Sequence, residues 1–393
     1  MTTVTTVHIV TSRFPPQIGG LEQWTQDLGT ALREAGLRPI VYVCEDPLGV
    51  RQRPSPFEIV DVARLRAPWE EPLLASAPES WRFEQERSRL TFACLRTELA
   101  KRTGSGPDVI LSNFVTTTGF TAHLVSEALG LPHVAVIAGT DFTRGVRSRI
   151  DRRVFWEVCR AASVVVGRNL EQVDAVRRQA PGTRCELIET SVEPPTRRWR
   201  RAPGPEITVF SDGGFNFKKG TGVLMDAFVA LRSRGVPARL VVCGGDQRGQ
   251  EAYWAERRRL LAGLAVSFPG YLGRDEIAER IRAADIYASA TLGEGSSAAR
   301  ALALCLGVPL VSTACGELTE DPEASHIRLT PVGDAAGFQD ALHDLATEMA
   351  AGALKIDERA VERFRRRFEP RREWAAWADL LRAVGAGRTP DRS

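Results

Sequence analysis

The chain has 393 residues, of which 43% are hydrophobic and 26% charged, and its formal net charge is +3. This length and composition are typical of a globular protein with two domains, and the small net charge gives no electrostatic basis for nucleic acid as the main partner. The first residues, MTTVTTVHIV, lack the basic segment of a signal peptide. No apolar run reaches the roughly 18 residues of a membrane span, so we expect a cytoplasmic protein without a strong membrane signal.

The cysteines and histidines form no pattern typical of a metal site. Seven cysteines are scattered without a C-x-x-C pair, and the five histidines form no ligand pair at helical spacing. An odd number of cysteines in apolar segments is typical of reduced packing residues. We therefore predict no structural metal.

A βα unit opens the chain. The apolar segment at 4–10 predicts a strand, and the apolar positions from Leu21 to Leu32 keep helical spacing. Between them lie Gly19 and Gly20. Glycines at this point allow a backbone to approach a ligand closely, but they also serve a tight turn with no ligand, and the sequence leaves both interpretations open.

Residues 46–106 are irregular and rich in proline, and we predict a loop-rich excursion followed by a helix at about 84–101. Alternating strands and helices then resume and complete a first domain over residues 1–195. Asp141 follows the strand at 134–137, at the place where ligands bind in open α/β sheets. A solvated helix cap is the competing interpretation of this aspartate.

The segment at 194–205, PPTRRWRRAPGP, has no periodicity and predicts a linker. A second α/β alternation over residues 196–355 predicts a second doubly wound domain. In the last segment, 356–393, we predict one helix from about 357 to 384 that packs across the domains, followed by a frayed tail. Within the second domain the predicted strands are 207–211, 239–243, 266–269, 286–288 and 310–312, and the predicted helices are 221–234, 251–263, 275–283 and 298–306.

The distribution of lysine singles out one loop. Arginine supplies nearly all the positive charge, since lysine occurs only at 101, 218, 219 and 355. Half of the lysines therefore form the dipeptide Lys218-Lys219. We predict a point-charge site there, although two exposed lysines in a loop are the alternative.

The segment from Asp285 to Pro309 predicts a buried strand, a tight turn and a helix. The helix begins near Ser296 and Ser297, where free backbone N–H groups and a partial positive charge suit an anion such as a diphosphate. Glu294 cannot bind phosphate, because like charges repel, and is better explained as an acceptor for the hydroxyls of an attached sugar. An ordinary capped connection with a solvated glutamate is the alternative.

Taken in order, these segments resemble the retaining glycosyltransferases of family 4. The N-terminal part is similar over FPPQIGGLEQWTQDLGTALREAG, and the second half over FKKG, VVCGG, FPGYLGRDEI, ADIYAS, GEGSS, LGVP and ACGELTE. The resemblance covers nearly everything outside 46–106. It implies the GT-B fold, an α/β architecture in which two Rossmann-like doubly wound domains face each other across a central cleft. It also implies transfer of a sugar from a nucleoside diphosphate with retention, without a metal, by a front-face path in which the leaving phosphate assists the incoming hydroxyl.

Carried over by position, the resemblance implies roles for individual residues. Gly20 lies near the donor diphosphate, Lys219 neutralises it, and Glu294 contacts the sugar hydroxyls. Asp141 falls where the family often keeps an aspartate that faces the reaction. The expected set is Glu294 and Asp141 at the reaction centre; Gly19, Gly20, Lys218, Lys219, Gly295, Ser296, Ser297 and Arg300 for the donor; and Glu22 and Arg144 for the acceptor.

Three positions depart from the family pattern. Leu302 replaces a second glutamate that grips the ribose hydroxyls, Gly214 replaces an arginine five residues before the lysine, and a histidine common at the end of the strand holding Ala138 is absent. Losing two charge-assisted contacts weakens donor binding by about 1.5–3 kcal/mol each if nothing replaces them. We expect Lys218 or Arg300 to supply the missing charge, and Leu302 suggests a pocket for a deoxyribose-linked donor.

We expect a glycosyltransferase that acts on a hydroxyl of a small polar acceptor, since no basic amphipathic helix or large apolar face points to a lipid. Heavy use of arginine is typical of GC-rich bacterial genomes, where such enzymes often modify natural products. Two alternatives remain: a GT-B enzyme that uses a sugar phosphate, of the phosphorylase or epimerase type, and a non-catalytic scaffold that binds a sugar or nucleotide. A two-domain cleft also predicts closure about the linker at 194–205.

Overall fold

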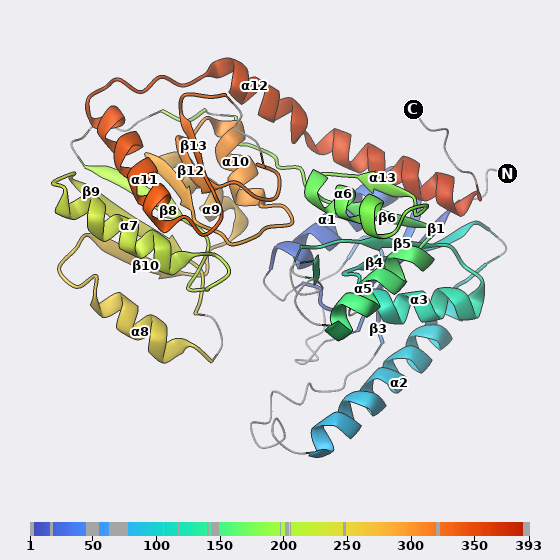
Figure 1. Ribbon diagram of the computed structural model, residues 1–393. Coiled ribbons are helices and arrows are strands. Elements are labelled where there is room, and N and C mark those ends of the chain that lie inside the picture. The colour runs from blue at the N-terminus through green and yellow to red at the C-terminus, as the bar shows by residue number, and fades with distance from the viewer. Residues whose placement is uncertain are drawn as a thin grey trace. The chain divides into compact units, whose positions relative to one another are not determined.

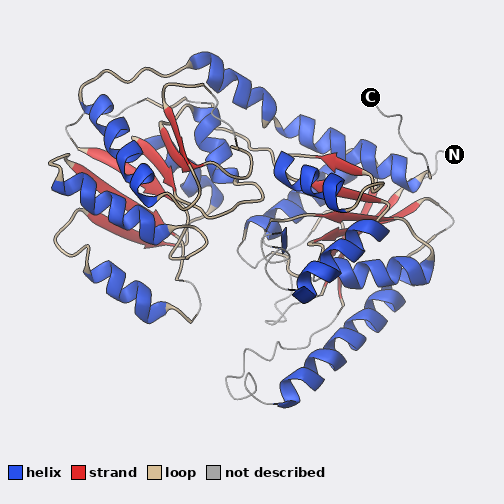
Figure 2. Cartoon of the chain, in the orientation of Figure 1, coloured by secondary structure: helices blue, strands red, loops and turns tan. Residues whose placement is uncertain are grey.

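The computed structural model forms two compact units, Met1–Glu189 with Arg371–Ser393, and Thr190–Pro370, and each is described by itself (Figure 1). Figure 2 shows that the strands of each unit gather in one sheet with helices around it. This confirms the predicted α/β class with two doubly wound domains. The residues described are 4–15, 19–44, 55–62, 78–104, 106–116, 118–139, 141–142, 149–196, 198–200, 204, 206–246, 249–319 and 323–387.

Among the described residues, the first unit has a seven-stranded sheet in the order β3-β2-β1-β4-β5-β6-β7. All neighbouring strands are parallel, and most are short runs of valine and isoleucine buried on both faces, as is typical of a sheet covered by helices. The strands are β1 (Thr6–Thr11), β2 (Arg38–Val43), β3 (Glu58–Asp61), β4 (Asp108–Asn113), β5 (His133–Val136), β6 (Val164–Gly167) and β7 (Cys185–Leu187). The helices are α1 (Gly20–Glu34), α2 (Pro78–Ala100), α3 (Thr118–Leu129), α5 (Arg149–Ala161) and α6 (Leu170–Gln179).

The proline-rich region contains a strand that the sequence pattern did not predict. β3 pairs in parallel with β2, with Ile40 opposite Glu58 and Val43 opposite Asp61. The strand has four residues, of which only Val60 is buried, so it is too short for a period of two to stand out. α2 also begins earlier than expected, at Pro78.

Among the described residues, the second unit has a six-stranded parallel sheet in the order β10-β9-β8-β11-β12-β13. Successive residues of its central strand β8 face different cores: Val209 packs in one apolar cluster and Phe210 in the other. The strands are β8 (Ile207–Ser211), β9 (Ala238–Cys243), β10 (Val266–Gly270), β11 (Ile286–Ser289), β12 (Leu310–Thr313) and β13 (Ile327–Thr330). The helices are α7 (Thr221–Ser233), α8 (Glu251–Arg259), α9 (Arg274–Ala283), α10 (Ala298–Leu306), α11 (Ala335–Ala350) and α12 (Glu358–Arg367). Of these, β13 and α11 were not predicted.

The prediction of one helix over 357–384 is wrong. The segment forms α12 in the second unit and α13 (Pro370–Gly385) in the first, with Pro370 as the first residue of the new helix. Proline is favoured at that position because its missing N–H has no intrahelical partner there. In α12, Phe364 packs in the apolar cluster that contains α10.

α13 is part of the core of the first unit. Trp377 is fully buried and packs in the apolar cluster of β1 and α1. Glu373 accepts a hydrogen bond of 2.8 Å from the indole of Trp24 and forms an ion pair of 2.6 Å with Arg168. The Arg168 guanidinium also lies 4.9 Å from the centre of the Trp24 ring. The chain therefore returns to its first unit after completing its second.

Within the described residues, no helix is both long enough and apolar enough to span a membrane. All seven cysteines are free thiols, and five of them are buried. This agrees with their prediction as packing residues.

Candidate functional site

The second sheet changes direction between β8 and β11. The chain adds β9 and β10 on one side of β8, and β12 and β13 on the other side of β11. Such a switch point opens a crevice outside the carboxyl ends of the two central strands, and ligands bind there in open α/β sheets. The loops that follow β8 and β11 therefore form the candidate site of this unit.

These two loops contact each other closely. The backbone N–H of Leu292 donates to the Lys218 carbonyl at 2.7 Å. Gly220 has a φ of +65°, and a Cβ at this position would overlap the Ala290 carbonyl. Only glycine combines this conformation with such a close approach. The turn after Lys219 is thus fixed against the loop that carries Glu294.

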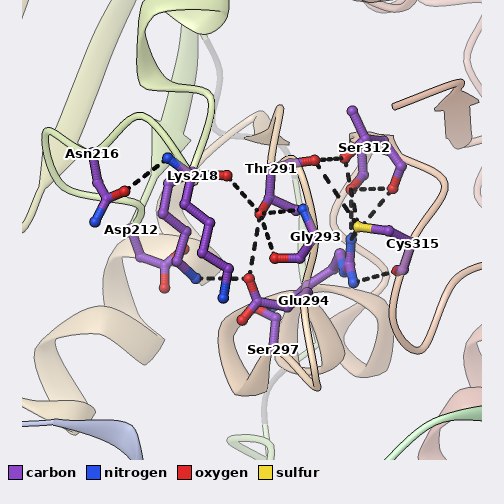
Figure 3. A network of polar contacts seen from close by, with 12 residues as sticks. Asp212, Asn216, Lys218, Thr291, Gly293, Glu294, Ser297, Ser312 and Cys315 are labelled. Atoms are coloured by element: carbon purple, nitrogen blue, oxygen red, sulfur yellow. Dashed lines mark hydrogen bonds and ion pairs between the residues drawn. The ribbon is translucent and has the colours of Figure 1, made fainter. Parts of the chain in front are cut away.

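Lys219 and Glu294 form an ion pair at this point (Figure 3). Nζ of Lys219 donates to Oε2 of Glu294 at 3.0 Å, and the Thr291 hydroxyl approaches the same oxygen at 3.4 Å. Burial alone would raise the pKa of Glu294, but the charges of Lys219 and Lys218 hold it below its ordinary value. The sequence placed a lysine and a glutamate at one ligand from segments 75 residues apart, and the structure brings them together as a charged pair.

Lys218 contacts the loop of Glu294 through its backbone. Its N–H donates to Oδ1 of Asn216 at 2.8 Å, and its carbonyl accepts a hydrogen bond from the Thr291 hydroxyl at 3.2 Å. Its charge also contributes to the low pKa of Glu294. Lys218 is partly exposed, and its charge acts on the same carboxylate as the charge of Lys219.

The first turn of α10 is capped within the chain. The Ser297 hydroxyl accepts a hydrogen bond from the Arg300 backbone N–H at 3.3 Å, as expected for a serine N-cap. The backbone N–H of Ser297 donates to Oε2 of Glu317 at 3.2 Å. Of the neighbouring residues, Gly295 is buried and Ser296 is partly buried. One N–H group of the predicted anion site is thus already bonded to a carboxylate of the protein.

Arg300 corrects an expectation from the sequence. Its side chain is 0% exposed, and so is that of Glu317, to which Nε and Nη2 donate at 2.7 and 2.9 Å. The remaining donors face the Ser312 hydroxyl and the carbonyls of Thr313 and Cys315. A guanidinium engaged in this way has no N–H group to offer a diphosphate, so Arg300 does not supply the missing charge.

Two of the three departures from the family pattern, Leu302 and Gly214, are buried. Leu302 is 8% exposed and packs in the apolar cluster of α10. Gly214 has a φ of +58°, and a Cβ there would lie 2.9 Å from the Gly245 carbonyl oxygen. An arginine at 214 would require this loop to move, because a side chain at positive φ is strained and the space is occupied.

Three predicted residues lie where α1 begins, in the first unit. Gly19 is the N-cap of α1 with extended backbone, and Gly20 is exposed. A Cβ at Gly20 would meet nothing within 4 Å, whereas one at Gly19 would overlap the Glu22 carboxylate. Glu22 therefore folds back over the loop at the start of the helix. Arg144 lies outside the described residues.

Asp141 is 4% exposed, which excludes the interpretation as a solvated cap. Oδ2 accepts a hydrogen bond from the Val115 backbone N–H at 2.8 Å, and Oδ1 accepts one from the Phe142 N–H at 3.0 Å. Burial raises the pKa of Asp141 to about 6, against the lowering effect of these hydrogen bonds. In this position Asp141 connects the loops that follow β4 and β5.

Three polar residues of the second unit contribute to the site without having been predicted from the sequence. Glu317 holds Arg300, Thr291 joins the loop of Glu294 to Lys218, and Asp212 accepts a hydrogen bond from the Tyr287 hydroxyl at 2.6 Å. Asp212 directly follows β8, so its place at a strand end was available as a signal. Among the described residues, no three histidine, cysteine, aspartate or glutamate side chains are grouped to hold a metal ion.

Two family models match the chain. The model described as "Glycosyl transferase 4-like domain" matches residues 19–203, and the one described as "Glycosyl transferases group 1" matches residues 206–348. Their boundary falls near the start of the second unit. No curated protein matches the chain.

Solved structures similar to this one share its fold at low sequence identity. Sucrose-phosphate synthase from Thermosynechococcus elongatus is 20% identical with a TM-score of 0.76, covering 98% of this chain and 100% of that one. HepE from Anabaena, solved with UDP and glucose, is 15% identical with a TM-score of 0.69, covering 96% and 99%. WaaG, described as a glycosyltransferase involved in lipopolysaccharide biosynthesis, is 15% identical with a TM-score of 0.66, covering 99% and 100%.

Proposed function

The chain belongs to the GT-B glycosyltransferases of the family 4 type, and on this premise we propose that it moves a sugar from a nucleoside diphosphate to a hydroxyl of a small polar acceptor. We further propose that the anomeric configuration is retained. The family and the fold support only the premise. The proposed donor and acceptor rest on the site described above, and the proposed retention rests on the resemblance to the retaining family.

The observation that carries the proposal is the pair of Lys219 and Glu294 at the switch point between β8 and β11. A lysine ammonium is a compact charge suited to a diphosphate, and an ionised carboxylate accepts hydrogen bonds from hydroxyls. A nucleoside-diphosphate sugar has a partner for each of these side chains, since its diphosphate is bonded directly to a sugar with free hydroxyls. In the proposed complex, Lys219 binds the diphosphate together with Lys218 and the turn Gly295–Ser297, and Glu294 binds the sugar.

Related structures support a nucleotide-sugar donor. HepE was solved with UDP, with UDP and glucose, and with UDP-glucose. We propose the same class of donor for this chain. We also propose that Lys219 supplies the charge for the leaving group and that no metal ion is needed, so that turnover survives an excess of chelator.

For the acceptor we propose a small polar molecule, such as a bacterial natural product, bound by the first unit. Gly19, Gly20 and Glu22 lie at the carboxyl side of β1, and Asp141 lies beyond β5. We keep Asp141 as a reaction-centre residue and Glu22 and Arg144 as acceptor contacts. The exposed backbone at Gly20 is suited to close approach by a ligand.

The test is a thermal-shift screen of the protein with UDP, GDP, ADP, thymidine diphosphate and their glucose derivatives. A ligand at 100 times its dissociation constant should stabilise the fold by about 2.7 kcal/mol. The shift should be base-selective and should be lost in Lys219→Ala. Lys355→Ala is the matched control, since Lys355 is an exposed lysine of the same unit. A screen with no shift for any nucleotide would contradict the proposal.

The products separate the proposed reaction from its alternatives. Release of nucleoside diphosphate with a product of the donor's own anomeric configuration, seen by NMR, supports a retaining transferase. Consumption of a sugar 1-phosphate with release of phosphate would instead identify a phosphorylase. Nucleotide binding without any turnover over a panel of acceptors would favour a non-catalytic scaffold.

A further inference from the structure

Asp212 is a carboxylate at the carboxyl end of β8 in the second unit. It directly follows β8, and its Oδ1 accepts a hydrogen bond of 2.6 Å from the hydroxyl of Tyr287 in β11. The Tyr287 side chain is fully buried, whereas Asp212 is partly exposed. The two residues therefore connect the central strands β8 and β11 where the sheet changes direction, and a buried donor holds one oxygen of a partly exposed carboxylate.

Asp212 acts on the same lysine as Glu294. Burial alone would lower the pKa of Lys219, but Glu294 and then Asp212 raise it. Lys219 is thus influenced by two carboxylates from separate loops. The groups of a nucleoside-diphosphate sugar have the same order as these side chains. Its diphosphate, which suits Lys219, carries the sugar on one side and the ribose on the other, and both of these have hydroxyls that suit a carboxylate.

The helix that borders this region offers no carboxylate of its own. α10 has the sequence AARALALCL, its one charged residue is Arg300, and that side chain is engaged with Glu317. Asp212 follows Phe210 by two residues, so it projects toward the same face of the sheet. That face packs Phe210, Tyr287 and Leu302 in one cluster. Asp212 thus places a carboxylate just beyond β8, beside the cluster that packs Tyr287 and α10.

A structural role alone explains this arrangement poorly. A buried tyrosine hydroxyl needs an acceptor, but a neutral oxygen would satisfy it. A second negative charge near Lys219 weakens the attraction of that lysine for a diphosphate. An ionised carboxylate accepts hydrogen bonds and donates none, which suits it to ligand hydroxyls rather than to phosphate.

We propose that Asp212 binds the ribose hydroxyls of the donor nucleotide, with Tyr287 as the residue that positions its carboxylate. The inference rests on the proposed function and adds to it a determinant of donor specificity. It predicts a preference for ribonucleotides, which is opposite to the deoxyribose donor suggested by Leu302.

The experiment compares binding of UDP, ADP and GDP with that of their 2′-deoxy forms by calorimetry, in the wild type and in Asp212→Asn. The wild type should bind the ribonucleotide of its preferred base about 10-fold or more tightly than the deoxy form. Asp212→Asn should lose about 10- to 100-fold in affinity for the ribonucleotide and little for the deoxy form. Tyr287→Phe should reduce the same discrimination by a smaller factor, because the carboxylate remains but is no longer held.

Melting temperatures separate this role from a structural one. If Asp212 serves only as an acceptor for Tyr287, Asp212→Asn should lower the melting temperature while the ratio of ribonucleotide to deoxynucleotide affinity stays the same, and that unchanged ratio would overturn the proposal. So would a wild type that prefers deoxynucleotides, or a loss of affinity confined to the intact nucleotide sugar, which would place Asp212 on the transferred sugar.

The same measurements test the role of Asp212 separately from the proposed function. Binding of nucleotides by the wild type without any effect of Asp212→Asn on ribose discrimination rejects the role of Asp212 and leaves the proposed function in place. A wild type that binds no nucleotide at all rejects both.

Discussion

The two sheets of this protein carry ionisable side chains beyond the carboxyl ends of their strands in different settings. In the second unit, the strand ends carry Lys219, Glu294 and Asp212, which are charged and partly exposed. In the first unit, whose sheet changes direction between β1 and β4, Asp141 lies beyond the neighbouring strand β5, is buried, and accepts backbone N–H groups with both of its oxygens. The carboxyl edge of a parallel sheet thus supplies the place for chemistry, but its side chains differ in burial: those of the second unit are partly exposed, whereas the proposed reaction-centre residue of the first is held by backbone N–H groups.

The largest effect that we expect is the loss of stability when the buried ion pair between Arg300 and Glu317 in the second unit is broken. Arg300→Met leaves Glu317 buried without its partner, so we expect the free energy of unfolding to fall by about 3–5 kcal/mol in urea titration. Arg300→Met with Glu317→Leu should recover most of this loss, since no charge is then left buried.

A matched control for this prediction is Arg234→Met. Arg234 forms an ion pair of 3.1 Å with Asp340, but both side chains are largely exposed. Such a pair contributes at most about 1 kcal/mol. If Arg300→Met lowers the free energy of unfolding no more than Arg234→Met does, the buried pair of Arg300 contributes no more to stability than an exposed pair, and the prediction is wrong.

The next effect concerns the buried aspartate of the first unit. The pKa of Asp141 is raised from 3.8 to about 6 in the folded state. The folded state therefore binds more protons between these pH values, and the contribution of Asp141 to the free energy of unfolding decreases as the pH rises through this window. The total change is about 3 kcal/mol.

Asp141→Asn should remove this contribution, so the stability of the variant relative to the wild type should increase from pH 4 to pH 7. The comparison is made between the two proteins because His133, whose pKa burial lowers to about 3, has the opposite effect in both. Stability curves that stay parallel over this range would show that Asp141 is not buried in solution as it is here.

The smallest of the three effects is on turnover. Glu294→Gln keeps the size of the side chain and removes the charge that pairs with Lys219 and accepts sugar hydroxyls. Because a hydrogen bond to a charged group contributes about 1.5–3 kcal/mol, we expect kcat/KM to fall by about 10- to 100-fold. Release of nucleoside diphosphate gives the rate, Glu256→Gln on the exposed side of α8 is the control, and full activity in Glu294→Gln would remove the glutamate from the site.

The alternation of strands and helices was sufficient to predict the class of the fold and to bring together Lys219 and Glu294. Both residues lie in loops that follow predicted strands of a doubly wound sheet, and parallel strands present their carboxyl ends at one edge. The position of the charged pair therefore follows from strand order and loop length. Side-chain contacts between distant segments are not needed to find it.

The role of Arg300 did require such contacts. Its place one turn into α10 suggested a charge near the anion site, but its side chain turns to Glu317, which comes from the loop after β12. Asp212 was overlooked for a related reason, since its hydrogen bond to Tyr287 joins residues 75 positions apart. β3 was missed because a four-residue edge strand gives too short a pattern.

The return of the chain to its first unit has a consequence for biosynthesis. α13 carries the buried Trp377 and the partner of Arg168, and it is translated only after all of the second unit. Domains fold on the ribosome as their residues emerge, at about 5–20 residues per second. The second unit can therefore complete its core before α13 is translated. Until then, part of the apolar surface of the first unit stays exposed. Newly made chains that stall before Arg371 should accordingly be clients of chaperones and sensitive to proteolysis in their N-terminal half.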